Sequence, residues 1–131
     1  MPQLKLDTLF KLNAVIAVGY ALAFFVAAKP LLAVYGIAPS VEGAFMARWF
    51  GVGLLAIGLA TWFARDVAES AAGRSLVRAL TLAYGVGTVL AVWGTLAGPF
   101  NTLGWIAVGF NALLGFGFAS AWHSRRQVQG D

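Results

Sequence analysis

Each of four apolar stretches of the sequence carries one polar side chain at a similar depth, and these residues are Tyr20, Arg48, Thr88 and Asn111. Arg48 is the charged one, and a guanidinium at the centre of a bilayer costs about 2.5–3.5 kcal/mol unless it finds partners. Counted along ideal helices, all four residues lie roughly 10–13 Å from the same end of their stretches. This common depth predicts a small polar ligand-binding pocket in the outer leaflet, in which Arg48 binds an anion.

A structural interpretation of the same residues stays open. Arg48 could tie its helix to a backbone carbonyl, to Glu42 or to a lipid phosphate. Thr88 belongs to a polar stripe at helical spacing whose hydroxyls could bond back to their own helix. The members of that stripe are Thr81, Tyr84, Thr88 and Thr95. On the first apolar stretch, Asn13 and Tyr20 are seven residues apart and share a face.

The composition defines the surroundings of these residues. Nine Lys or Arg and five Asp or Glu make 11% of the 131 residues, whereas 60% are hydrophobic. A soluble domain has about 25% charged residues, so this chain could not keep a soluble surface hydrated. The absence of cysteine excludes disulfides and thiolate sites. The basic residues flank apolar segments and form no run, which argues against a nucleic-acid partner.

Four apolar stretches are each close to the length that crosses a bilayer. They cover approximately residues 10–28, 44–64, 77–97 and 104–122. Because an open sheet would leave backbone groups unpaired in lipid, they predict helices. The expected fold is an all-α polytopic membrane protein, in which residues 1–131 form one antiparallel four-helix transmembrane bundle. We read the first stretch as a retained helix, although Lys5, Lys11 and Val26–Ala28 also resemble a signal peptide.

Residues that typically end or cap helices separate the four apolar stretches. Pro30 is expected to end the first helix, and Ser40 to cap the second. Residues 31–37 could form a short segment along the membrane interface. The short Gly98–Asn101 turn makes the third and fourth helices antiparallel neighbours.

The basic residues predict the orientation. Seven of them lie on the side of the termini and the middle loop, and only Lys29 and Arg48 lie toward the other side. By the positive-inside rule both termini are cytoplasmic, and residues 123–131 form a polar cytoplasmic tail. All five tryptophans fall near the ends of the stretches, as an aromatic belt requires.

Small residues recur every four positions and predict close helix packing, within the bundle or in a homodimer. These stripes are Gly43, Ala47 and Gly51; Ala83, Gly87, Ala91 and Thr95; and Ala107, Gly115 and Ala119. The stretch that begins at Trp49 also resembles the one that begins at Trp105. Either a duplicated hairpin or a chance likeness of Gly-rich spans explains this similarity.

The sequence offers no catalytic set. No carboxylate lies inside a span, and the single histidine, His123, follows Trp122 at the boundary, where it is expected to be solvated. One histidine provides neither bis-His haem ligation nor a metal site. We therefore expect a non-enzymatic protein without a cofactor or a metal.

The pattern Lys29-Pro30, Tyr35-Gly36-Ile37, Ala47-Arg48-Trp49-Phe50-Gly51 and Gly58-Leu59, followed by Trp62 and Arg65, resembles small four-span bacterial membrane proteins of the DoxX-like kind. The resemblance covers mainly residues 19–65 and implies a bundle in the bacterial inner membrane, with Arg48 and Gly51 as marked positions. DoxX is associated with quinone-linked redox complexes.

The expected role is an accessory subunit or small-ligand-binding module with Arg48, Asn111, Tyr20 and Thr88 as its ligand-binding residues. A small oligomeric transporter or channel for an anionic or lipophilic substrate is the first alternative, and a quinone-interacting subunit of a redox complex is the second. The expected partners are the lipid bilayer and either a larger membrane complex or further copies of the chain.

Overall fold

The computed structural model describes residues 5–128 of the protein. Its elements are α1 (Leu6–Val34), α2 (Val41–Ala64), the short 3-10 helix η1 (Arg65–Val67), α3 (Ala71–Leu96) and α4 (Gly104–Val128). The four long helices are all long and apolar enough to cross a membrane. The expected all-α four-helix membrane fold is thereby confirmed.

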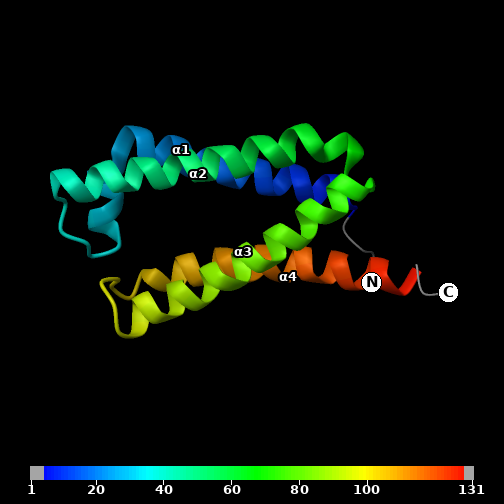
Figure 1. The fold of residues 1–131 in the computed structure, drawn as a ribbon. Helices are drawn as coiled ribbons and strands as arrows, with labels where there is room; N and C mark the ends of the chain where they lie inside the picture. Colours follow the sequence, from blue (N-terminus) through cyan, green and yellow to red (C-terminus); the bar gives the residue numbers. More distant parts are fainter. Residues whose placement is uncertain (1–4, 129–131) are drawn as a thin grey trace.

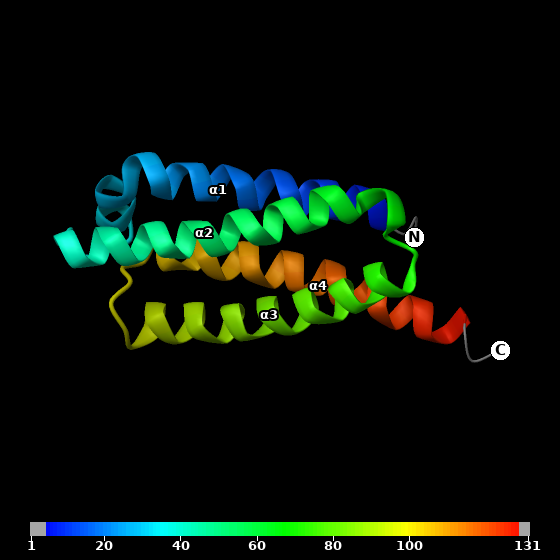
Figure 2. The same ribbon diagram turned by 45° about the horizontal axis from the view of Figure 1, so that its top comes forward.

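The helices form two hairpins that lie against each other as two layers (Figures 1 and 2). α1 runs along α2 and α3 runs along α4, whereas few backbone contacts join one hairpin to the other. The expected neighbourhood of the third and fourth helices is therefore confirmed. Lys5, η1 and the end of α4 lie at one end of the bundle, here named the terminal end. The turns at 35–40 and 97–103 lie at the opposite end.

Pro30 bends the first helix and does not end it, so the expectation that this proline closes the helix was wrong. Proline lacks an N–H and its ring crowds the carbonyl of Val26, four residues earlier. The distortion appears at Ala27, which has φ −132° and ψ 44°, and the chain then continues as helix to Val34. Most of the expected interfacial segment at 31–37 is consequently the last part of α1.

The helix ends follow local chemistry. Gly36 follows α1 with φ +80°, a conformation that residues with a Cβ rarely adopt. The Ser40 side chain accepts a hydrogen bond of 2.8 Å from the Gly43 N–H, which confirms the expected cap of α2. Ser70 caps α3 in the same way, by accepting from Gly73 at 3.1 Å.

Small residues allow close approach inside each hairpin. A Cβ on Gly51 would lie 3.3 Å from the Ala21 carbonyl oxygen of α1, and one on Gly58 would lie 3.2 Å from that of Ala14. In the other hairpin, a Cβ on Gly115 would lie 3.2 Å from the Tyr84 Cβ. Gly51 and Gly115, which are members of the small-residue stripes, thus pack within the bundle.

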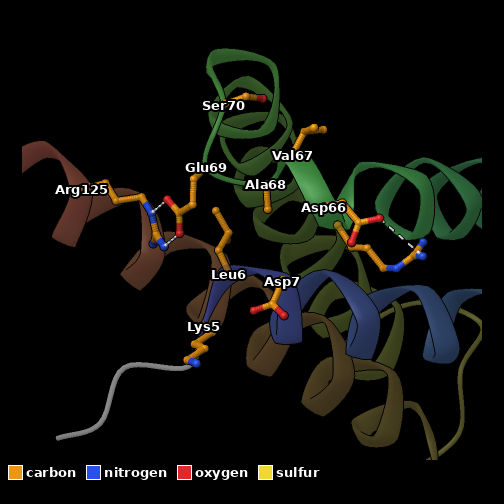
Figure 3. A pocket seen from close by; sticks show the side chains of 10 residues that line it. Lys5, Leu6, Asp7, Asp66, Val67, Ala68, Glu69, Ser70 and Arg125 are labelled. Carbon is orange, nitrogen blue, oxygen red and sulfur yellow. Dashed lines mark hydrogen bonds and ion pairs between the residues drawn. The ribbon is translucent and has the colours of Figure 1, made fainter.

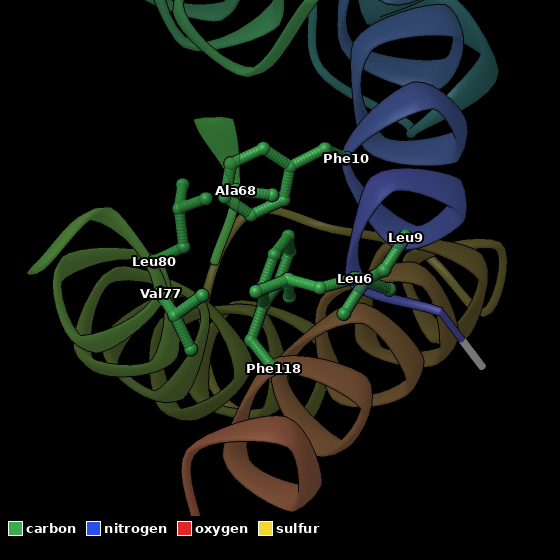
Figure 4. Packing of buried hydrophobic residues seen from close by; sticks show 7 residues of the cluster. All are labelled: Leu6, Leu9, Phe10, Ala68, Val77, Leu80 and Phe118. Carbon is green, nitrogen blue, oxygen red and sulfur yellow. The ribbon is translucent and has the colours of Figure 1, made fainter. Parts of the chain in front are cut away.

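The main buried cluster lies at the terminal end and holds the two hairpins together there (Figure 4). It consists of Leu6, Leu9, Phe10, Ala68, Val77, Leu80 and Phe118. Most other large apolar side chains point outward, and Val26, Phe63 and Phe116 are each more than 70% exposed. In a bilayer such side chains face lipid, so their exposure suits a membrane-spanning protein.

The last helix extends past the predicted span. α4 continues beyond Trp122 to Val128, so most of the segment expected as a tail is helical. Residues 129–131 of that expected tail lie outside the described residues.

We predict that Gly58→Ala destabilises the protein by about 1–3 kcal/mol, since the new methyl would lie 2.7 Å from Val18 Cγ2 and 3.1 Å from the Val18 nitrogen. The matched control is Gly53→Ala in the same helix, where a Cβ meets nothing within 4 Å. The free energy of unfolding, measured by SDS titration in mixed micelles, checks this difference. Equal effects of the two substitutions would contradict the described packing of α1 on α2.

Candidate ligand cavity between the hairpins

A buried hydrogen-bond network joins α1, α2 and α3. The Asn13 side chain on α1 donates from Nδ2 to the Thr61 hydroxyl on α2 at 3.2 Å. The Tyr84 hydroxyl on α3 donates to Asn13 Oδ1. Asn13 and Thr61 are fully buried. Because this carboxamide contacts both hairpins, it fixes their relative position in the interior of the bundle.

The remaining groups of this network are also paired. The Thr61 hydroxyl lies 3.0 Å from the carbonyl oxygens of Ile57 and Gly58 in its own helix. The Tyr84 ring stacks on Phe118 with ring centroids 6.0 Å apart and an angle of 5° between the planes. Tyr84 thus connects the polar network to the apolar cluster at the terminal end.

A second set of contacts joins the hairpins at the opposite end. Asn101, in the turn between α3 and α4, donates from Nδ2 to the Val34 carbonyl at 3.0 Å. Its backbone N–H donates to the Tyr35 carbonyl at 2.9 Å. A Cβ on Gly36 would lie 3.0 Å from the Asn101 Cβ, so this contact also requires glycine at position 36.

A cavity of about 140 Å³ lies between the hairpins, with Tyr35 and Tyr84 among its lining residues. Both hairpins contribute to its wall. The lining residues are Ile16, Ala17, Tyr20, Phe24, Tyr35, Phe50, Leu54, Tyr84, Ala107, Phe110, Asn111 and Leu114. Half of them are aromatic, and the polar groups are three phenols and one carboxamide.

Edge-to-face pairs hold the aromatic wall in place. Tyr20 meets Phe110 across the two hairpins with centroids 5.5 Å apart and an angle of 78° between the planes. Phe24 meets Phe50 at 5.3 Å and 90° within the first hairpin. Such pairs are the favoured aromatic geometry, so they stabilise the positions of these four rings.

Asn111 supplies hydrogen-bonding capacity to this wall. Its Nδ2 donates to the Ala107 carbonyl of its own helix at 2.9 Å. Its Oδ1 lies above Gly87, where a Cβ would approach to 2.3 Å, so only glycine leaves room for the carboxamide. Oδ1 accepts no hydrogen bond from the described residues, which leaves one acceptor available beside the cavity.

Two of the four expected site residues line this cavity and two do not. Tyr20 and Asn111 are part of the wall. Arg48 is not among the lining residues, and its Nε donates to the Phe25 carbonyl at 3.5 Å. Thr88 donates to the Tyr84 carbonyl of its own helix at 2.7 Å and does not line the wall either.

The neighbouring threonines behave like Thr88. Thr81 donates to the Val77 carbonyl at 2.8 Å, and Thr95 donates to the Ala91 carbonyl at 2.7 Å. The polar stripe on α3 is therefore mostly satisfied within the helix. Tyr84 is the member that reaches another helix.

A shallow groove adjoins the cavity on the side that faces lipid. It is lined by Val15, Ile16, Gly19, Tyr20, Ala23 and Phe110. Tyr20, Ile16 and Phe110 line both the groove and the cavity. The Tyr20–Phe110 ring pair is thus a common wall between the groove on the membrane side and the interior space.

Charged residues gather at the terminal end around a cleft of about 650 Å³ (Figure 3). Arg125 of α4 binds both carboxylate oxygens of Glu69, with Nε 2.8 Å from Oε2. This hydrogen-bonded partner holds the pKa of the Glu69 carboxyl below its usual value of 4.5. The pair ties the loop before α3 to the end of α4.

Sequence reasoning missed several residues of this arrangement. Thr61 carries no signal of its own, because a single threonine in an apolar span usually bonds to its own helix. Tyr35 follows a proline that was expected to end the helix, which hid its position in the wall. The spacing of Asn13 and Tyr20 was the usable signal, since it placed two polar groups on one face of α1.

Comparison of the chain with known protein families, characterised proteins and solved structures found no match. In residues 5–128, no group of three His, Cys, Asp or Glu side chains could hold a metal ion. The candidate site is therefore defined by its own geometry, as an aromatic cavity with a few polar groups between two hairpins.

We predict that Tyr84→Phe lowers the free energy of unfolding by about 0.6–1.7 kcal/mol, which are the average and the maximum for hydrogen bonds between membrane helices in double-mutant cycles. The control is Thr81→Val, which removes only a bond within α3 and should cost less than about 0.5 kcal/mol. A double-mutant cycle with Asn13→Ala isolates the contact between the hairpins. A coupling energy of zero would refute the network's role.

We predict that the stability contributed by Glu69 depends on pH. Because its folded-state pKa is lowered, the unfolded chain binds its proton more readily. The contribution is fully present above pH 4.5 and is lost as the pH falls through the lowered pKa. Since the pair is exposed, Glu69→Gln should cost less than about 1 kcal/mol at neutral pH and nothing in strong acid.

Unfolding measured across this pH range tests the assignment. The matched control is Glu42→Gln at the opposite end, because Glu42 forms no ion pair with the described residues. An unchanged pH profile for the Glu69 variant would show that the Arg125 contact contributes nothing.

Proposed function

We propose that the protein is a non-enzymatic membrane protein that binds one small, lipophilic, ring-bearing molecule between its two hairpins. The observation that carries this proposal is the aromatic cavity with Asn111 in its wall. In this proposal the ligand reaches the cavity from the bilayer, and the four helices span a bacterial inner membrane with both termini in the cytoplasm.

The size of the cavity favours a single ring. An engineered apolar cavity of about 150 Å³ accommodates one benzene molecule. At about 140 Å³, the cavity between the hairpins is of this size. A ligand with a long apolar chain fits only if the chain leaves the cavity, and the adjoining groove offers room for it.

The chemistry of the wall favours an aromatic or quinoid ring that carries a hydroxyl or carbonyl group. Aromatic side chains at the wall offer edge and face contacts to such a ring. Asn111 Oδ1 accepts from a ligand hydroxyl, and the second Nδ2 hydrogen donates to a ligand carbonyl. An orienting polar group within an apolar pocket is the usual composition of a small-molecule site.

The groove on the membrane side favours access from lipid. It is lined by apolar residues and by Gly19, above which a Cβ would meet nothing within 4 Å. In this proposal, rotation of the Tyr20 and Phe110 side chains opens the wall between the groove and the cavity. A ligand dissolved in the bilayer could therefore enter sideways.

The quinone-interacting subunit is the second candidate function. The observation that favours it is that an apolar groove adjoins the ring-sized cavity across the Tyr20–Phe110 pair, an arrangement that suits a quinone ring with an isoprenoid tail. Against the transporter alternative, Arg48 lies away from the cavity, and the Asn13–Tyr84 contact closes the bundle toward the terminal end. Arg48 stays as a predicted anchor for an anionic headgroup.

We predict that the purified protein binds 4-propylphenol and that Ala107→Phe, which fills the cavity, abolishes this binding. The matched control is Ala112→Phe on the exposed side of the same helix, which should bind the phenol as the parent does. Asn111→Leu should weaken the binding about fivefold, by the loss of one hydrogen bond. Native mass spectrometry of the protein in detergent measures all three.

Equal binding by the Ala107 and Ala112 variants would contradict the cavity as the site. Decylubiquinone provides the comparison for the second candidate function. If decylubiquinone displaces the phenol from the parent protein, and if Tyr20→Phe weakens the binding of decylubiquinone, the quinone role is favoured. If it binds without displacing the phenol, the quinone role is rejected while the first proposal stands.

A further inference from the structure

Four arginines surround a small hollow at the terminal end, between the start of α3 and the end of α4. They are Arg74, Arg78, Arg125 and Arg126, and Val77 and Trp122 complete the wall. The hollow has a volume of about 20 Å³, which is enough for one oxygen-sized atom and no more. It lies in the second hairpin alone and is separate from the aromatic cavity.

The positive charges of this hollow are largely uncompensated. Glu69 is the carboxylate that pairs with Arg125, and no other ion pair of the described residues involves these arginines. Arg74 donates to the Glu69 backbone carbonyl at 2.6 Å, and Arg126 lies 5.1 Å from the centre of the Trp122 ring. Arg78 forms no hydrogen bond or ion pair with the described residues.

Trp122 adds a hydrogen-bond donor that lacks an acceptor. Its indole Nε1 is buried and has no partner in the described part of the chain. Buried polar groups nearly always find a partner, so an orphaned N–H on a side chain that lines a positively charged hollow is a candidate donor to a bound acceptor. One anionic oxygen would satisfy it.

The position of Arg74 also favours an anion. Arg74 lies in the first turn of α3, which contains no acidic residue, and Arg78 lies about one turn further along the helix. The positive end of the helix dipole disfavours cations there, and a bound anion would offset the repulsion. Arg125 and Arg126 are favourably placed in the last turn of α4.

We propose that this hollow binds the phosphate group of an anionic phospholipid in the leaflet on the terminal side. One phosphate oxygen accepts the Trp122 N–H, and Arg78 and Arg126 neutralise the charge. A lipid supplies this group where a soluble anion would not, because the hollow adjoins the end of two membrane-spanning helices and includes the apolar Val77. The proposal is independent of the function proposed for the cavity.

The test uses the full chain in detergent and native mass spectrometry with added phosphatidylglycerol or phosphatidylcholine. We expect phosphatidylglycerol to bind at least about fivefold more tightly. Arg78→Gln should weaken its binding about fivefold. Arg65→Gln is the matched control, because Arg65 lies at the same end but outside the hollow and pairs with Asp66 at 3.5 Å.

Trp122→Phe distinguishes a built site from general attraction to a basic surface. It keeps an aromatic side chain and every charge but removes the N–H, and we expect about tenfold weaker phosphatidylglycerol binding. An equal loss of phosphatidylglycerol binding in Arg65→Gln and Arg78→Gln would overturn the proposal. Unchanged phosphatidylglycerol binding in Trp122→Phe would overturn it as well. The Phe substitution keeps the protein testable if an arginine variant fails to fold.

Two further measurements are needed. The first distinguishes a lipid from a soluble anion as the source of the phosphate, and the second distinguishes this proposal from the one for the cavity. Inorganic phosphate at millimolar concentration should not displace the lipid, and displacement would assign the hollow to a soluble anion instead. Ala107→Phe should leave phosphatidylglycerol binding unchanged, so failure of the cavity proposal would not be mistaken for failure of this one.

Discussion

A buried carboxamide must find all its hydrogen-bond partners inside the protein, and in this bundle that requirement sets the relation between the two hairpins. Asn13 reaches Thr61 in its own hairpin and Tyr84 in the other. Lipid offers no competing donors or acceptors, so the bundle cannot slide without leaving these groups unpaired. The aromatic cavity lies between two contacts that join the hairpins, the Asn13 contact toward the terminal end and the Asn101 contact at the opposite end.

The fold was predictable because hydropathy and length dominate in a membrane protein. Four apolar stretches need internally satisfied backbones, and helices follow from that. Local details that depend on contacts with neighbouring helices were harder to predict from the sequence. Pro30 was expected to end α1, whereas the helix bends at Ala27 and continues to Val34, and Ala28 and Leu32 pack there with Ala44 and Ala47 of α2.

The position of each site residue along its helix was predictable from the sequence, but the neighbour toward which its side chain points was not. Counting residues along a helix gives the height of a side chain, and Tyr20 and Asn111 do share a cavity. The face that a residue occupies depends on which helices pair, which the sequence did not settle. Arg48 therefore lies against the backbone of α1 and not in the cavity, and Thr88 is satisfied by its own helix.

Each hydrogen bond described between the hairpins ends on α1 or on Tyr35, and none begins on α2. The position of α2 is therefore set by α1, against which it packs closely at Gly51 and Gly58. Its outward face can change its side chains without disturbing the relation of the hairpins. That face is consequently the part of the molecule most free to adapt to bilayers of different thickness or to a neighbouring protein.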